Sequence, residues 1–365
     1  MIHFALFGDY ERTPDLKRFA EGIQQEMEEH GFKRVSTEFP QLQLVLNFVD
    51  PNRPKPFRRK GNGTFVVSIT EYDEPVEPVS NILKTGYPIL IRSLGNLMIF
   101  IDRSRPVSST HFITLEQGCY AVSRPEEDDQ YFREVFERLR PLATTRLVIN
   151  NIFHPDLPED LWEGDETSES ISRAGKKLDE MNLLPAPFPI QELLPPREFR
   201  HIKRLYGIGG LSYGNLSARR DKNEFWMSAS GVNKGNLSRI GKDILLVKGY
   251  DEDQSAMELS VPSNIKPNRV SVDAIEHWMI YNEHPEVGAI VHIHAWMEGV
   301  PSTEINYPCG TVQLAEAVAG LIREAEDPSR AVIGLKNHGL TITGRDLDDI
   351  FERIEGKIIP QVPMS

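Results

Sequence analysis

The sequence contains very little cysteine. Only two of its 365 residues, Cys119 and Cys309, are cysteines. They lie far apart along the chain and form no Cys-x-x-Cys pair, so the sequence indicates neither a disulfide framework nor a thiolate zinc site. This scarcity is typical of proteins kept in a reducing compartment, and we expect a cytoplasmic protein.

Long apolar runs and an excess of positive charge are also missing. No basic segment precedes an apolar one at the N-terminus, and the apolar stretch "YPILIRSLGNLMIFI" (87–101) is interrupted by Arg92, Gly95 and Asn96. These features predict neither a signal peptide nor a membrane span. The formal net charge of −13 argues against broad binding to nucleic-acid phosphates. We therefore expect a small-molecule substrate, with no nucleic-acid or membrane partner.

Apolar periodicity divides the chain into two α/β parts. Residues 1–150 alternate short strand-like runs with helical patterns, which predicts an α/β domain. Residues 151–196 carry an acidic patch and then five prolines in "LLPAPFPIQELLPP" (183–196), so we expect a connector there. A helix is predicted across "SISRAGKKLDEMN" (170–182) within it. The alternation of strands and helices starts again in residues 197–365.

Three histidines are the strongest chemical signal. In "VHIHAW" (291–296), His292 and His294 share an apolar run, and a strand would send both side chains to one face. His338, in "LKNHGLTIT" (335–343), follows another apolar strand, where a loop can aim a side chain into a cleft. Three neutral imidazoles and a carboxylate form a common catalytic zinc set. The alternative is a pair of core histidines bonded to carbonyl groups.

From about residue 195 to its end, the chain resembles the class II aldolase/adducin family. The resemblance is carried by five segments in order, namely "GNLSAR" (214–219), "SASG" (228–231), "SVD" (271–273), "HIH" (292–294) and "NHG" (337–339). It implies a class II aldolase/adducin-like three-layer α/β/α domain, which follows the N-terminal α/β domain predicted from periodicity. The fold class is hence α/β (α+β). We recognise no family in residues 1–150.

The resemblance also implies a site. His292, His294 and His338 match the family's zinc ligands, and another divalent metal such as Mn²⁺, Co²⁺ or Fe²⁺ would suit the same set. The substrate phosphate or an equivalent anion would be held by four further residues: Asn215, Ser230, Gly231 and Ser271. We expect a metal-dependent lyase that performs aldol cleavage on a small hydroxycarbonyl compound of carbohydrate metabolism, phosphorylated or not, through a metal-stabilised enediolate.

Two departures from the family pattern keep other reactions open. In this family, the aldolases and a methylthioribulose-phosphate dehydratase usually carry glutamate at the position of Asp273. A ribulose-phosphate 4-epimerase of the family carries an aspartate there, as a metal ligand. Glu276 lies one helical turn on, as a candidate acid/base or as a solvated surface residue. Val272 replaces a second serine of sugar-phosphate members. Epimerisation, dehydration and decarboxylation therefore stay open, as does a non-catalytic adducin-like assembly module.

The C-terminus departs as well. Only 27 residues follow His338, whereas catalytic members continue with a tail that lends a tyrosine to a neighbouring active site. Tyr307 is a candidate substitute, with a core or interface tyrosine as the alternative. The resemblance further implies a homo-oligomer, commonly a tetramer, while substrate identity and native metal stay open.

Overall fold

The chain folds into two units. The computed structural model describes residues 1–59, 63–73, 79–103, 109–114, 118–123, 128–185, 192, 194–206 and 212–365. The first unit comprises residues 1–144, 188–209 and 364–365, and the second comprises residues 145–187 and 210–363. None of the described helices has both the length and the apolar composition needed to cross a membrane.

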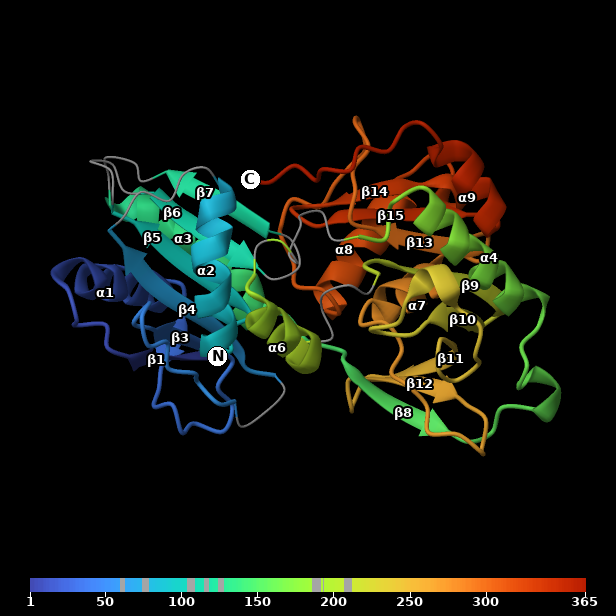
Figure 1. The fold of residues 1–365 in the computed structure, drawn as a ribbon, viewed down its shortest axis with the longest axis horizontal. Coiled ribbons are helices and arrows are strands. Elements are labelled where there is room, and N and C mark those ends of the chain that lie inside the picture. Colours follow the sequence, from blue (N-terminus) through green and yellow to red (C-terminus); the bar gives the residue numbers. More distant parts are fainter. Residues whose placement is uncertain are drawn as a thin grey trace. The chain divides into compact units, whose positions relative to one another are not determined.

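The first unit is built on a seven-stranded sheet (Figure 1). In spatial order its strands are β2 (Phe32–Arg34), β1 (Ile2–Gly8), β3 (Leu44–Phe48), β4 (Phe65–Tyr72), β5 (Leu97–Asp102), β6 (Ser109–Thr114) and β7 (Gly118–Ser123). The strands from β2 to β5 pair in parallel, and β5, β6 and β7 pair antiparallel. Parallel strands covered on both faces read as continuous apolar runs, which explains the sequences of β3 and β5.

Helices cover both faces of this sheet. They are α1 (Pro14–Glu29), α2 (Val79–Ser93), α3 (Asp128–Thr144) and α6 (Pro196–Tyr206). On β6, the hydroxyl of Thr110 lies 2.5 Å from that of Tyr131 in α3, while Ile113 contacts Gly86 of α2. Because residues of even and odd number point to opposite faces of a strand, α3 and α2 lie on opposite sides. The predicted N-terminal α/β layer structure is confirmed.

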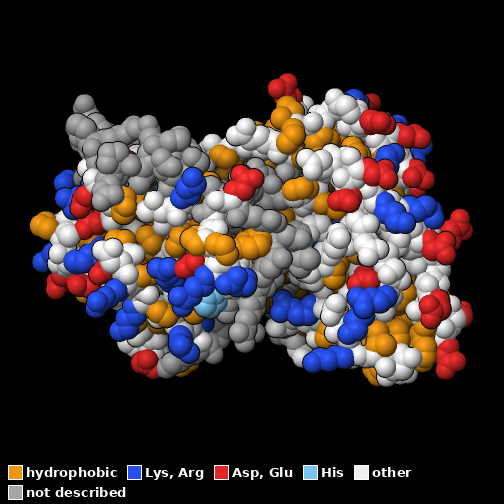
Figure 2. Space-filling model, in the orientation of Figure 1, with side chains coloured by type: hydrophobic (Ala, Val, Ile, Leu, Met, Phe, Trp, Pro, Cys, Tyr) orange, Lys and Arg blue, Asp and Glu red, His pale blue; other side chains and the backbone are white. Residues whose placement is uncertain are grey.

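The second unit is built on an eight-stranded sheet. In spatial order its strands are β14 (Val332–Leu335), β15 (Gly339–Gly344), β13 (Ala289–Ile293), β9 (Asn215–Asp221), β10 (Glu224–Ser228), β11 (Ile244–Asp251), β12 (Ala256–Ser260) and β8 (Asn150–His154). Every neighbouring pair is antiparallel except β12 and β8, which pair in parallel. In Figure 2, many of the surface side chains of this unit are Asp or Glu, drawn in red.

Two helical layers enclose the second sheet. The helices are α4 (Glu166–Glu180), α7 (Ala274–Glu283), α8 (Val312–Arg323) and α9 (Leu347–Ile354), with the short 3₁₀ turns η1 (Glu159–Leu161), η2 (Lys234–Asn236) and η3 (Pro328–Arg330). Phe225 and Met227 of β10 share one core with α7 and α8, whereas Trp226 shares the other with α4 and α9. This alternation confirms the predicted three-layer α/β/α arrangement.

Part of the expected connector lies inside the second unit. Strand β8 pairs with β12, and α4 begins with a capping box between Asp165 and Ser168 and buries Ile171 and Leu178. Of the acidic residues of this region, Asp165 caps this helix, and Glu166 and Glu169 lie in the first helical turn. Composition alone does not distinguish such a segment from a linker. Conversely, α6 belongs to the first unit, where Glu198 pairs with Arg92 at 2.6 Å.

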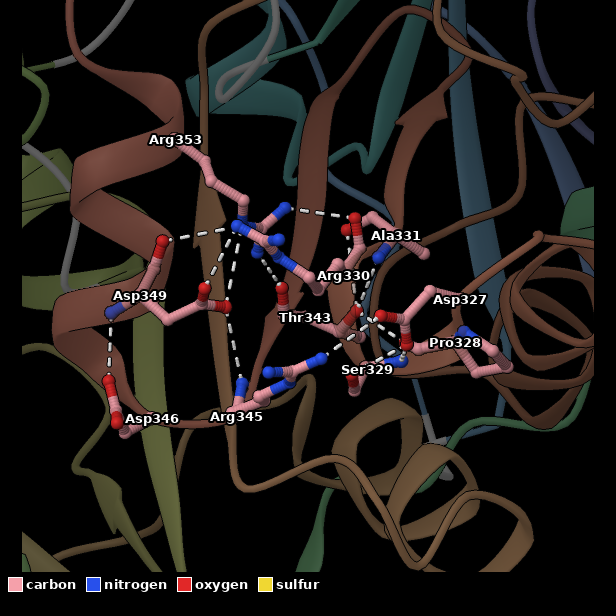
Figure 3. Close-up of polar contacts among 10 residues, drawn as sticks. All are labelled: Asp327, Pro328, Ser329, Arg330, Ala331, Thr343, Arg345, Asp346, Asp349 and Arg353. Atoms are coloured by element: carbon pink, nitrogen blue, oxygen red, sulfur yellow. Dashed lines mark hydrogen bonds and ion pairs between the residues drawn. The ribbon is translucent and has the colours of Figure 1, made fainter.

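A polar network fixes α9 to the end of β15 (Figure 3). The carboxylate of Asp349 pairs with Arg330 at 3.2 Å and with Arg353 at 3.4 Å. The Arg353 guanidinium also donates to the main-chain oxygens of Thr343 and Arg330. Asp346 caps the helix by accepting from the Asp349 N–H at 2.8 Å. The network thus fixes one end of β15, the strand whose other end follows His338.

Candidate metal centre

The three histidines come from the ends of two neighbouring strands. His292 lies in β13, where it is paired with Thr341 of β15 on one side and Asn215 of β9 on the other. His294 lies one residue beyond the end of β13, and His338 lies in the turn between β14 and β15. Because β13 and β15 run antiparallel, the end of one strand lies beside the start of the other.

The imidazoles converge. One ring nitrogen from each of His292, His294 and His338 lies within 4.8 Å of the others. The Nε2 atoms of His294 and His338 are 3.2 Å apart, close to the ~3.3 Å expected for two nitrogens on one tetrahedral zinc ion. The three side chains are 1%, 8% and 3% exposed.

Hydrogen bonding and burial leave these rings in the form that binds metal. His292 donates through Nδ1 to the carbonyl of Leu340 at 3.0 Å, which leaves its Nε2 buried with no partner among the described residues. The Nδ1 atom of His294 is buried and unpartnered in the same sense. Burial lowers the pKa of His292 and lowers those of His294 and His338 well below the usual value, so the rings are neutral at pH 7. The residues present fit a divalent metal.

Two glycines permit the close backbone packing that this geometry needs. A β-carbon on Gly214, whose φ is +71°, would lie 2.3 Å from the carbonyl oxygen of His292. A β-carbon on Gly339 would lie 2.1 Å from the carbonyl oxygen of Ile293. The glycines of "GNLSAR" and "NHG" thus have a steric role beside the histidines.

Asp273 lies at the N-cap position of α7. The Asp273 carboxylate makes no capping bond, because its Oδ2 accepts from the amide of Asn215 at 2.7 Å. Asp273 Oδ1 and Asn215 Oδ1 are both buried without a hydrogen-bond partner in the described part of the chain. Two acceptor atoms are therefore unsatisfied within one small site.

Glu276 is buried, so the solvated surface position considered for it is wrong. It is 2% exposed, and Thr341 donates to its Oε1 at 2.5 Å. Burial, with the charge of Asp273 as a second cause, raises the pKa of Glu276 to about 8. Glu276 is thus protonated at neutral pH and available for proton exchange.

His277 has a structural environment. Its Nδ1 lies 2.7 Å from the hydroxyl of Ser217, which lies 2.8 Å from the hydroxyl of Tyr281. Burial lowers the pKa of His277 to about 3, so the ring stays neutral.

The "SASG" and "SVD" segments meet side by side. Ala229 forms an isolated antiparallel bridge with Val270, and the Ser271 N–H donates to the carbonyl of Ser228 at 3.3 Å. Ser230 donates its main-chain N–H to Arg269 at 2.9 Å, and Gly231 follows with a φ of +70° and open space around its α-carbon. The roles of Ser230, Gly231 and Ser271 in holding an anion stay predictions.

Two residues at the site escaped the sequence analysis. Lys234, in η2, is 3% exposed, and its charge acts on Asp273, His292 and His294. Cys309 has its Sγ 3.5 Å from Nε2 of His338. Neither residue belongs to a helical or strand-like apolar pattern. The sequence signals that could have pointed to them are the position of Lys234 soon after "SASG" and the fact that Cys309 is one of two cysteines.

Comparison with known proteins identifies the class of this domain. Residues 199–356 match the family described as Class II Aldolase and Adducin N-terminal domain. The resemblance stated from the sequence is therefore confirmed for these residues. Residues 1–198 lie outside the match.

Curated relatives cover about a third to two fifths of this chain. A protein named L-fuculose phosphate aldolase from Methanocaldococcus jannaschii is 28% identical over 141 residues, which span 33% of this chain and 78% of the relative. A 3-oxo-tetronate 4-phosphate decarboxylase from Haemophilus influenzae is 28% identical over 174 residues, with 42% and 76% covered. A methylthioribulose-1-phosphate dehydratase from Citrobacter koseri is 27% identical over 172 residues, with 39% and 78% covered. All three names describe lyase-type reactions.

Proposed function

We propose that this protein is a metal-dependent lyase that cleaves a bond next to the carbonyl group of a small hydroxycarbonyl substrate. The observation that carries the proposal is the convergence of three buried, neutral imidazoles. Two of them, His292 and His294, have a ring nitrogen with no partner among the described residues. Zinc suits this ligand set best, and Mn²⁺, Co²⁺ or Fe²⁺ are alternatives. When bound, such an ion supplies Lewis-acid polarisation of a substrate oxygen.

The residues of the chain would supply the rest. His292, His294 and His338 hold the ion, and the Leu340 carbonyl sets the tautomer of His292. Asp273, oriented by Asn215, offers one unpartnered carboxylate oxygen as a fourth ligand or as a base. Glu276 is the second candidate acid/base, since its raised pKa of about 8 keeps it protonated near neutral pH.

Retro-aldol cleavage ranks first among the reactions. The three relatives named above are an aldolase, a decarboxylase and a dehydratase, so the same site type is compatible with several outcomes. Asp273 keeps epimerisation as a second candidate. Catalytic assignment to Asp273 and Glu276, and a homo-oligomeric state, belong to the proposal.

Metal analysis of the purified full-length protein tests the proposal. We expect one equivalent of zinc or a similar ion per chain, and we expect His294→Ala to lose it. The matched control is His284→Ala, which should retain the metal, because His284 is a buried histidine whose Nε2 lies 3.4 Å from the Ala319 carbonyl. The metal-loaded protein would then be screened against hydroxycarbonyl phosphates and acids. A protein that binds no divalent metal and is unaffected by His294→Ala would be a non-catalytic module.

A further inference from the structure

Lys234 is a buried cation, and no anion among the described residues is bonded to it. Its side chain is 3% exposed, and its ammonium donates to the carbonyl of Ser212 at 2.8 Å. Within the described ranges, the ammonium forms no ion pair with a carboxylate, and the main-chain carbonyl of Ser212 is its one hydrogen-bond acceptor. Burying an unpaired charge costs free energy of folding, so a role in ligand binding would account for a lysine at this position.

The segment that follows Ser212 connects Lys234 to the metal centre. The ring of Tyr213 lies 5.3 Å from that of His294. Gly214 then packs against the backbone of His292, and Asn215 bonds Asp273. Since the charge of Lys234 also acts on Asp273, His292 and His294, its ammonium lies near the proposed metal ligands.

Donors and acceptors in this volume do not satisfy one another. An ammonium has three N–H groups, and a single acceptor is bonded to that of Lys234 in the described chain. Nearby, Asn215 Oδ1 and Asp273 Oδ1 are buried acceptors without donors. Free N–H groups on a buried ammonium are expected where a ligand with acceptor oxygen atoms binds, whereas unpaired acceptors suit a metal ion or a hydroxyl group of the ligand.

We propose that the Lys234 ammonium binds the oxyanion of the substrate directly, so that this site takes an anionic substrate, either a phosphate ester or a carboxylate. This inference rests on the proposed function and adds a substrate-binding residue to it. The Ser212 carbonyl holds the ammonium in place and leaves its other N–H groups for the ligand.

The charge balance of the site agrees with this assignment. Burial lowers the pKa of Lys234 to about 8, which leaves the ammonium form predominant at neutral pH. Glu276, with its pKa raised to about 8, is neutral there, and so are the three histidines. The charges of Lys234 and Asp273 offset each other, and a divalent cation would make the site positive. An anionic substrate balances that charge.

Calorimetric titration of the full-length protein, as purified and after loading with zinc, tests the inference with two probes. Sulfate represents a tetrahedral phosphate group, and glycolate represents a 2-hydroxycarboxylate. We expect one of them to bind the wild-type protein, and both Lys234→Met and Lys234→Gln to weaken that binding ~10-fold or more. Lys222→Met, which removes an exposed charge in the turn between β9 and β10, is the matched control and should change nothing.

Thermal unfolding separates this role from a structural one. If Lys234 serves the ligand, removing its buried charge leaves the melting temperature of the ligand-free protein unchanged or higher. A lower melting temperature in both variants, unchanged anion affinity, or no affinity of the wild-type protein for either probe would each overturn the inference. The His294→Ala metal analysis reports on the proposed function separately, so either proposal can fail while the other stands.

Discussion

The amide of Asn215 donates a 2.7 Å hydrogen bond to the carboxylate of Asp273, and both side chains are buried. The two residues are 58 positions apart and belong to different elements, β9 and the N-cap of α7. The bond holds the carboxylate away from the helix N–H groups and fixes its free oxygen within the site. All four tryptophans lie in the second unit: Trp162, Trp226, Trp278 and Trp296. Tryptophan fluorescence therefore reports the unfolding of this unit selectively.

A double-mutant cycle measures the Asn215–Asp273 bond. A hydrogen bond to a charged group contributes about 1.5–3 kcal/mol, so the coupling between Asn215→Ala and Asp273→Ala should fall in that range. Urea unfolding of chelator-treated protein, followed by tryptophan fluorescence, gives the four free energies. A coupling near zero would show that the bond does not orient Asp273.

Glu276→Gln should change how stability depends on pH. The pKa of Glu276 rises from 4.5 to about 8 on folding, so folding takes up a proton between these values. The free energy of unfolding of the wild-type protein, compared with that of Glu276→Gln, is therefore highest below pH 4.5. This advantage is lost as the pH rises through about 8. The loss is on the order of 5 kcal/mol when complete.

Urea midpoints of the metal-free proteins at pH 5 and pH 9 check this difference. Glu276→Gln should unfold near the wild-type midpoint at pH 5 and at clearly higher urea at pH 9. Equal midpoints at both values would mean that Glu276 titrates as an exposed carboxylate does.

Gly339→Ala should weaken metal binding. The added β-carbon would lie 2.1 Å from the Ile293 oxygen, so β13 and β15 must separate where His294 and His338 meet. We expect a loss of about tenfold or more in zinc affinity, since ligand spacing sets the geometry of the site. Competition with a chromogenic chelator measures it.

Gly320→Ala is the control for that substitution. Gly320 lies in α8, and no described atom lies within 4 Å of a β-carbon placed on it. Alanine stabilises a helix interior by about 1 kcal/mol relative to glycine, so this variant should be more stable with unchanged zinc affinity. Equal zinc affinities for the Gly339→Ala and Gly320→Ala variants would contradict the steric argument.

Asp349→Asn should loosen α9. The substitution removes the partner of both Arg330 and Arg353, and these pairs are partly shielded from solvent. We expect a loss of about 1–2 kcal/mol in the free energy of unfolding, measured with urea and tryptophan fluorescence. Asp348→Asn, an exposed carboxylate one residue earlier in the same helix, should stay within about 0.5 kcal/mol of wild type.

The histidine site could be predicted in part from local patterns. A spacing of one residue in "HIH" places His292 and His294 on one face of a strand. The addition of His338 was implied by the family resemblance, because its position depends on the pairing of β13 with β15. The alternation of strands and helices in both units was predictable because strand and helix periods are local properties. The three-layer arrangement of the second unit was implied by the family resemblance.

Burial and long-range pairing were decided only by the tertiary structure. Whether Glu276 is solvated or buried depends on Thr341, which arrives from β15. Whether Lys234 faces water or the metal centre depends on the segment that begins at Ser212. The placement of α4 in the second unit depends on its contacts with that unit's sheet and with η2. Charged residues have the same sequence signature at a surface and in a site, and only packing separates the two environments.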